Sequence, residues 1–180
     1  MDKQLAKISK YFSFILRHEP QAIGLTLDEN GWAVIAELID KTTDFELDLP
    51  TIRLVVESND KQRFTMDNER GVIRANQGHS INVDLALEPL APPPVLLHGT
   101  AERFIKSIKE SGLVKQNRHH VHLSESKDVA INVGGRYGKP VLLEIDTQSM
   151  VNAGHQFYRS VNNVWLVESV PAEYIRFRNA

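Results

Sequence analysis

Apolar side chains recur every three or four residues near the start of the chain, which is the period of an α-helix with one buried face. This pattern covers residues 3–18, and similar patterns cover residues 32–40 and 49–58. Residues 62–66 and 71–77 instead alternate between apolar and polar positions on either side of the turn sequence DNERG. The first part of the chain is therefore expected to fold as three helices followed by a β-hairpin.

That order of elements is typical of a winged-helix module, a common nucleic-acid docking fold. A stiff, extended linker is predicted next, because four prolines fall within residues 87–95. We place the linker at residues 89–94, between one domain at residues 1–88 and a second at residues 95–180. The expected fold class is α+β, with two lobes.

The second half of the chain changes to short strand-like runs around one helix. A helix is predicted over residues 101–112, with Thr100 as its N-terminal cap and Gly112 at its C-terminal end. It is expected to bury Phe104, Ile105 and Ile108. The predicted strands are VLLHGT, HVHLS, PVLLEID, NVWLVES and EYIRFR.

Composition narrows the class of protein. Apolar residues make up 42% of the chain and charged residues 24%, which is ordinary for a globular protein. The absence of cysteine excludes disulfides and thiolate chemistry and favours a reducing, cytoplasmic compartment. No apolar run of about 18 residues predicts a membrane span, and the N-terminus lacks the apolar stretch of a signal peptide. A formal net charge of −2 argues against a protein that binds nucleic acid by covering many phosphates, so any RNA would have to be held in a focused basic pocket. We expect a monomer.

Two polar stretches in the first half are candidates for a functional site. Arg17 and His18 end the first helix in the sequence FSFILRHEP, where cations are favoured at a helix C-terminus and a proline commonly follows. Both lie off the apolar stripe, however, so neither is needed to cover the core. In IRANQGHS, Gln77 and His79 flank Gly78 where the hairpin should finish, and a solvated turn explains this stretch equally well.

Two glycine-containing stretches in the second half suggest ligand binding. LHGT places His98 and Gly99 between a strand and a helix, a corner that suits an anionic ligand. GGRYGK is similar to a phosphate-binding loop, but Val133 stands where that loop needs glycine and Pro140 where it needs Ser or Thr. A glycine-rich turn between helix and strand is therefore favoured for GGRYGK.

The stretch RHHVHLS packs three histidines into four positions. His120 and His122 would share one face of a strand and could meet one zinc ion. Since there is no cysteine and no obvious acidic partner nearby, a strand that buries Val121 and Leu123 is favoured, and no metal is expected.

Seven stretches occur in order along the chain, namely SFILRHEP, ENGW, NDKQRF, IRANQGHS, LHGT, RHHVHLS and NNVWL. In the content and order of these stretches, the chain resembles the RNA 2′-phosphotransferases, also called tRNA splicing 2′-phosphotransferases, over residues 5–177. The resemblance implies NAD-dependent removal of an internal 2′-phosphate from RNA. It also implies a winged-helix-like N-terminal lobe that binds RNA and an ADP-ribosyltransferase-like C-terminal lobe that binds NAD.

The resemblance further implies an Arg-His-Arg-Arg quartet that carries the reaction. The matching residues are Arg17, His18, Arg63 and Arg118. Arg74 in IRANQ is a rival for one of the arginines, and we assign Arg74 and His79 to RNA binding instead. Three arginines at one phosphate would explain how a slightly acidic protein holds RNA.

On the NAD side, resemblance to ADP-ribosyltransferases indicates a set of five contacts: His98, Gly99, Thr100, Ser124 and Arg136. His98 would hydrogen-bond a ribose hydroxyl, and the backbone of Gly99 and Thr100 would approach the nicotinamide amide. NAD is a co-substrate on this interpretation. Two alternatives stay open: an ADP-ribosyltransferase that modifies terminal nucleic-acid phosphates, and a winged-helix nucleic-acid-binding protein without enzymatic activity.

Overall fold

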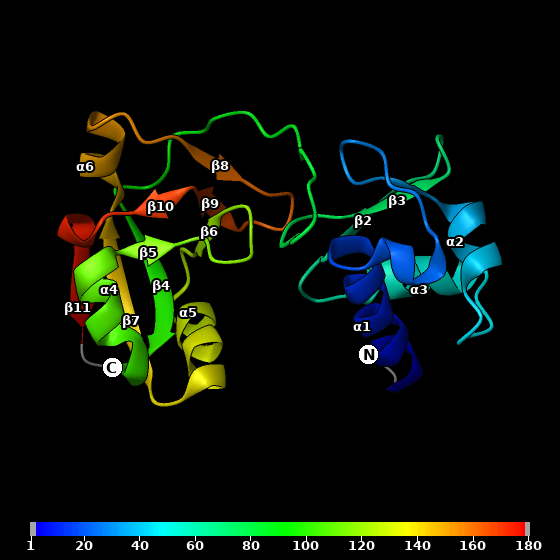
Figure 1. Cartoon of the computed structure of the whole chain (residues 1–180), viewed down its shortest axis with the longest axis horizontal. Helices are drawn as coiled ribbons and strands as arrows, with labels where there is room; N and C mark the ends of the chain where they lie inside the picture. Colours follow the sequence, from blue (N-terminus) through cyan, green and yellow to red (C-terminus); the bar gives the residue numbers. More distant parts are fainter. Residues whose placement is uncertain (1–2, 179–180) are drawn as a thin grey trace. The chain divides into compact units, whose positions relative to one another are not determined.

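The structure, a computed structural model, describes residues 3–178, and its backbone contacts divide the chain between Ala86 and Leu87 into two units (Figure 1). The N-terminal unit begins with a helix over almost the whole predicted range, because its apolar stripe is buried. The elements of this unit are α1 (Lys3–Arg17), the 3-10 turn η1 (Pro20–Ile23), β1 (Ala33–Val34), α2 (Ile35–Lys41), α3 (Leu49–Glu57), β2 (Phe64–Asp67) and β3 (Val72–Ala75).

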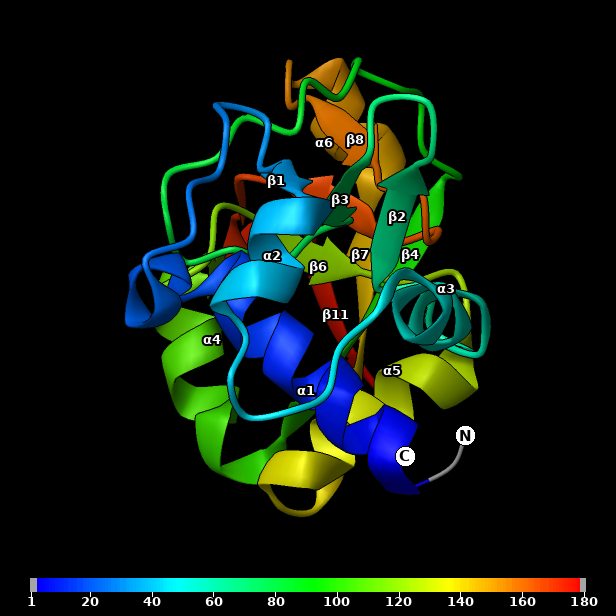
Figure 2. The same ribbon diagram turned by 90° about the vertical axis from the view of Figure 1, so that its right-hand side faces the viewer.

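The predicted hairpin forms, and β1 extends it to a three-stranded antiparallel sheet in the order β1-β3-β2. Figure 2 shows β3 between β1 and β2, with α1 and α3 beneath them. The prediction of a helix over residues 32–40 is wrong at its start. Residues Ala33 and Val34 pair with Ile73 and Val72 instead, and the helix begins only at Ile35, whose N–H donates to Gly71 O at 2.9 Å. Strand pairing thus outweighs the helical spacing at this point.

The core of the N-terminal unit lies between the helices and one face of the sheet. Helix α1 packs against α3 and β3. The rings of Phe12 and Phe64 meet edge to face with centroids 5.9 Å apart. This contact stabilises the core through both buried apolar area and the favourable geometry of the two rings. Ile73 and Ala75 of β3 are buried in this core, so the residue between them, Arg74, lies on the opposite face of the sheet.

The C-terminal unit is richer in strands than the N-terminal unit. Its elements are β4 (Val95–Ala101), η2 (Glu102–Phe104), α4 (Ile105–Ser111), β5 (Leu113–Val114), β6 (Val121–Leu123), α5 (Lys127–Gly134), η3 (Gly135–Tyr137), β7 (Pro140–Asp146), α6 (Thr147–Asn152), β8 (Phe157–Arg159), β9 (Trp165–Val167), β10 (Ser169–Val170), η4 (Ala172–Tyr174) and β11 (Ile175–Arg178). All five predicted strands occur, whereas the helix α6 and the strands β5 and β8 were not predicted. The unit is therefore α+β, as expected.

Small antiparallel sheets make up this unit, in the orders β11-β7-β4, β6-β9-β8 and β10-β5. A bridge between Leu97 and Ser124 joins the first two, with both backbone N–H···O bonds at 2.8 Å. One buried core, which includes Leu96, Leu143 and Trp165, fills the unit.

The expected cap of the helix after LHGT is wrong. Thr100 lies inside β4, paired with Val141, and the strand continues to Ala101. The chain then makes the 3-10 turn η2 before α4 begins at Ile105, and no side chain caps either element. Phe104, which was expected to be buried, is 40% exposed, because the turn at its position rotates it away from the core.

Helix α5 packs alongside β4 (Figure 1). A Cβ atom on Gly99 would come within 1.6 Å of Ala130 O, and one on Gly134 within 2.5 Å of Thr100 O. Glycine at both positions is therefore required by this close packing.

The proline-rich residues 89–94 contain no helix or strand. Within this stretch, Leu90 N donates to Phe157 O at 2.8 Å, so its backbone is attached to the C-terminal unit. On the other side of the division, Asp84 N donates to Glu29 O at 2.9 Å and attaches that residue to the N-terminal unit.

Candidate active site

Arg17 and His18 stand at the C-terminal end of α1 and are held there by the segment that follows the hairpin. Ser80 N donates to Arg17 O at 2.9 Å, and Ser80 Oγ lies 2.8 Å from His18 Nδ1. The Arg17 guanidinium is half-buried, 5.9 Å from the centre of the Phe64 ring, whereas His18 is exposed. The sequence IRANQGHS therefore does more than form a solvated turn, because its last residue contacts both.

Arg63 lies just before β2 and reaches the same region. Arg17 Nη2 donates to Arg63 O at 3.5 Å, and Arg63 Nη1 donates to Asn59 Oδ1 at 3.1 Å. Asn59 Nδ2 in turn donates to Ser9 Oγ at 2.9 Å, and the two residues are only 2% and 4% exposed. A buried amide thus ties the third predicted member of the quartet to the helix that carries the first two.

The structure therefore brings together Arg17, His18 and Arg63, as expected for three groups that act on one ligand. The guanidinium groups of Arg17 and Arg63 are both positively charged, and an anion is favoured close to either of them. Their planar forks are suited to the oxygens of a phosphate.

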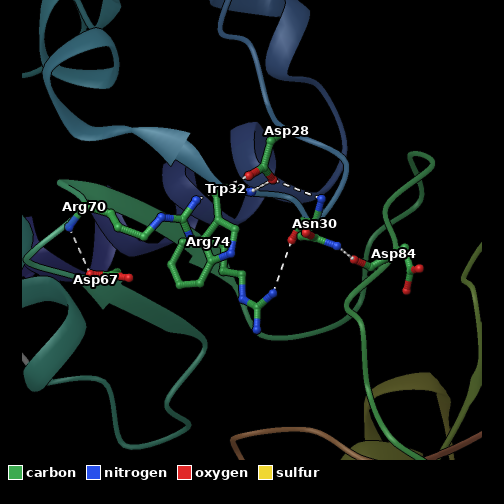
Figure 3. Close-up of polar contacts among 7 residues, drawn as sticks. All are labelled: Asp28, Asn30, Trp32, Asp67, Arg70, Arg74 and Asp84. Carbon is green, nitrogen blue, oxygen red and sulfur yellow. Dashed lines mark hydrogen bonds and ion pairs between the residues drawn. The ribbon is translucent and has the colours of Figure 1, made fainter.

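Arg74 occupies a different place, on the sheet face away from the core. Figure 3 shows its guanidinium against Trp32, and the distance from its Cζ to the ring centre is 4.5 Å. Its Nη1 donates to Asn30 O at 3.3 Å. Burial lowers the pKa of Arg74 and the neighbouring charge of Arg70 lowers it further, whereas Asp28 raises it.

His79, the second predicted RNA contact, is only 3% exposed. A Cβ atom on Gly31 would lie 3.4 Å from its Nε2, so the imidazole packs closely against that backbone. His79 is therefore buried inside the N-terminal unit, and Arg74 is the more accessible of the two to solvent.

In the C-terminal unit, His122 connects Arg118 with His98. Arg118 Nη1 lies 3.2 Å from His122 Nδ1, and since arginine only donates, this Nδ1 is the acceptor. The carbonyl of His122 accepts a hydrogen bond from His98 Nδ1 at 2.9 Å. The proton of neutral His98 is therefore on Nδ1, and its Nε2 is an acceptor.

The charge of His98 follows from its surroundings. Burial lowers the pKa of His98, the carbonyl of His122 raises it, and the positive charge of Arg118 lowers it. Because burial is the largest of these causes, His98 is neutral near pH 7. A neutral imidazole with a fixed tautomer suits hydrogen bonding to a hydroxyl better than binding of a phosphate.

The other predicted dinucleotide contacts occupy varied positions. Gly99 and Thr100 are buried inside β4, rather than at a strand end. The hydroxyl of Ser124 accepts from Ser126 N at 3.0 Å and so shapes the turn that leads into α5. Arg136 is exposed in η3.

The histidines of RHHVHLS lie within and just before β6. Among residues 3–178, no group of three or more His, Cys, Asp or Glu side chains is arranged to hold a metal ion. Val121 and Leu123 are buried, as expected for the strand interpretation. Within the same part of the chain, none of the helices combines the length and apolar character needed to span a membrane.

Sequence reasoning missed residues that position others, among them Trp32, Asn59 and His122. All three fall inside stretches singled out above, ENGW, NDKQRF and RHHVHLS. The signal was therefore present as polar or aromatic residues within the motifs. Their partners could be found only from the structure.

Comparison with known proteins gives a consistent result. The family model described as "RNA 2'-phosphotransferase, Tpt1 / KptA family" matches residues 3–169. A "Probable RNA 2'-phosphotransferase" of Acaryochloris marina is 54% identical over 176 residues, with 97% of both chains covered. A protein with the same description from Pseudomonas aeruginosa is 52% identical, over 97% of this chain and 97% of its own length. Another from Nostoc punctiforme is 50% identical, over 97% of this chain and 98% of its own length.

Proposed function

Because the chain belongs to the RNA 2′-phosphotransferase, Tpt1 / KptA family, we propose that it removes an internal 2′-phosphate from RNA in two steps, with NAD as the co-substrate. Membership of this family makes the chain a transferase. The observation that carries the proposal is the grouping of Arg17, His18 and Arg63 around the end of α1, held by Ser80 and Asn59.

We propose that the N-terminal unit is a winged-helix-like RNA-binding lobe. Its order of elements, a helix, a short strand, two helices and a hairpin, together with its three-stranded antiparallel sheet, supports this assignment. The C-terminal unit is the ADP-ribosyltransferase-like lobe that binds NAD, in line with the resemblance of its LHGT and RHHVHLS stretches.

In the first step, the 2′-phosphate of the RNA attacks the anomeric carbon of the nicotinamide ribose. The bond to nicotinamide breaks, nicotinamide leaves, and RNA-2′-phospho-ADP-ribose forms. A phosphate monoester is largely dianionic at neutral pH, so this step needs no general base. It needs the dianion to be held in place beside a ribose that develops positive charge, and Arg17 and Arg63 supply that hold.

In the second step, the neighbouring ribose 2″-hydroxyl attacks the phosphorus and the RNA 2′-oxygen leaves. The products are ADP-ribose 1″,2″-cyclic phosphate and RNA with a free 2′-hydroxyl. Arg118 stabilises the negative charge that grows on the phosphoryl oxygens, as arginine does in other phosphoryl transfers. His18 moves the proton between the attacking hydroxyl and the leaving oxygen, since imidazole titrates in the required range.

His98 and Gly99 are the proposed contacts to the dinucleotide. His98 Nε2 accepts from a ribose hydroxyl, because its Nδ1 proton is used on His122 O. The backbone N–H and C=O of Leu97 point away from β7 and both hydrogen-bond Ser124. Gly99 lies two residues further along β4, so its N–H and C=O point to the same side of the strand as those of Leu97. That side suits a nicotinamide carboxamide. Arg136 and Ser124 are further candidates for contacts.

The test is incubation of the protein with NAD and a short RNA that carries one internal 2′-phosphate. The proposal predicts nicotinamide release, loss of the 2′-phosphate and formation of ADP-ribose 1″,2″-cyclic phosphate. The same RNA with a 2′-hydroxyl is the control and should yield no nicotinamide. Accumulation of ADP-ribosylated RNA that is not processed further would instead indicate an ADP-ribosyltransferase, and unchanged NAD would indicate a binding protein.

A further inference from the structure

The contacts of Trp32 and Arg74 define a second candidate site in the N-terminal unit. Trp32 lies opposite Arg74, because β1 and β3 are antiparallel with Ala33 across from Ile73. Asp28 Oδ1 accepts from the backbone N–H groups of both Asn30 and Trp32 at 2.9 Å, which fixes the turn that carries the indole (Figure 3). The surface under the guanidinium of Arg74 is therefore firmly held.

Arg74 itself is a half-buried cation with little to neutralise it. Within residues 3–178, the Arg74 side chain makes one hydrogen bond, from Nη1 to Asn30 O. No carboxylate of these residues lies within ion-pair distance of it. Its Nε is enclosed and makes no hydrogen bond to any described residue. A partly desolvated guanidinium without a counter-charge is a costly arrangement in a free protein, and an anionic ligand would offset that cost.

Arg70 provides a comparison within the same cluster. Its Cζ lies 5.6 Å from the centre of the Trp32 ring, and its Nη2 lies 3.8 Å from Asp28 Oδ2. Unlike Arg74, Arg70 is exposed and has a carboxylate partner. The two arginines share an aromatic neighbour and differ in burial and neutralisation, so only Arg74 calls for an external anion.

We propose that Arg74, held against the ring of Trp32, binds a backbone phosphate of the substrate RNA other than the 2′-phosphate that reacts. This inference rests on the proposed function, which supplies a phosphate-rich ligand to a chain of net charge −2. Trp32 orients the guanidinium plane and keeps its outer N–H groups available, so that the arginine binds phosphate with little loss of side-chain freedom. Arg74 thereby positions the RNA strand and takes no part in the chemical steps.

The experiment measures the affinity of the intact protein, without NAD, for two single-stranded RNAs that differ only in one internal 2′-phosphate. Arg74→Gln is expected to weaken binding of both RNAs by about tenfold at low salt. It should also reduce the slope of log affinity against log salt concentration by about 0.7, the value for one phosphate contact on a single strand. Trp32→Leu should weaken binding by about two- to fivefold with the slope unchanged, because it removes no charge.

Arg70→Gln is the matched control, because it removes the same charge from the same aromatic neighbour. We expect its affinities to stay within about twofold of the unmodified protein, as for other exposed ion-paired groups. If Arg70→Gln and Arg74→Gln lost the same affinity for RNA, the effect would be one of general surface charge, and the proposal would be overturned. A loss confined to the 2′-phosphorylated RNA would overturn it as well, by placing Arg74 at the reacting phosphate.

Nicotinamide release by the unmodified protein is measured with the same 2′-phosphorylated RNA. If NAD is consumed and Arg74→Gln binds both RNAs normally, the inference about Arg74 fails and the proposed function stands. If NAD is not consumed while Arg74→Gln shows the expected loss on both RNAs, the RNA contact stands and the proposed reaction fails. Melting temperatures within a few degrees of each other show that all variants compared are folded.

Discussion

Asn59 is predicted to position Arg63, and substitution to alanine tests this directly. The Asn59 side chain accepts from Arg63 Nη1 and Lys61 N and donates to Ser9 Oγ. Asn59→Ala removes all three bonds and leaves the buried Ser9 hydroxyl without this partner. An unsatisfied buried group costs about 1–3 kcal/mol, and with the two other bonds we expect a loss of about 2–4 kcal/mol in the free energy of unfolding.

Activity should fall for a separate reason. Without Asn59, the guanidinium of Arg63 loses a hydrogen bond that helps to set its position, and a displacement of about 1 Å in a positioning group can reduce the rate by about 100-fold. The assay is single-turnover nicotinamide release at saturating RNA and NAD, at a temperature at which the variant is fully folded by circular dichroism. The expected result is a large fall in the rate constant with little change in the RNA concentration that gives half-saturation.

Ser9→Ala is the matched control for Asn59→Ala. It breaks the bond to Asn59 Nδ2 and leaves the bond between Asn59 Oδ1 and Arg63, so it should lower stability by about 1–3 kcal/mol while activity stays close to normal. The reasoning would be refuted if Asn59→Ala and Ser9→Ala lost stability alike and both kept full activity. Arg63 would then hold its position without the amide.

Four further predictions concern other parts of the structure. Gly99→Ala should lower the melting temperature strongly or prevent folding, measured by circular dichroism, because its Cβ would overlap Ala130 O. Arg17→Lys should retain under a tenth of the activity in nicotinamide release, since it keeps the charge and loses the fork, and near-normal activity would argue against bidentate binding. Arg118→Ala should accumulate ADP-ribosylated RNA, detected by mass spectrometry, and equal loss of both steps without this species would contradict its assignment to the second step. Burial lowers the pKa of His98 below its value in the unfolded chain, so the contribution of this group to stability decreases as the pH falls below about 6.5. His98→Asn keeps a hydrogen-bond donor at the Nδ1 position and removes the titrating group. Between pH 7 and pH 5, its free energy of unfolding from urea titrations should therefore decrease less than that of the unmodified protein.

The elements with strong periodicity could be predicted from the sequence because one local pattern determines each of them. The apolar stripe of α1 and the alternation of β2 and β3 gave their positions to within two residues. The start of α2 could not be found in this way. Ala33 and Val34 fit a helical pattern, and only their pairing with β3, about 40 residues away, makes them a strand.

The candidate site divides in the same way. Arg17, His18 and Arg63 could be named from motifs, and the structure places them together. Asn59 could not be assigned its role, because a buried amide between Ser9 and Arg63 depends on three segments meeting. The failure at Thr100 has a comparable cause, since the partner strand β7 draws that residue into the sheet before a helix can begin.

His122 serves Arg118 and His98 through chemically different groups, the imidazole for the first and the main-chain carbonyl for the second. Replacement of the His122 side chain would therefore disturb the arginine and spare the histidine. Under the proposed function, a substitution at this residue would alter the group assigned to phosphoryl transfer and leave the proposed dinucleotide contact of His98 in place.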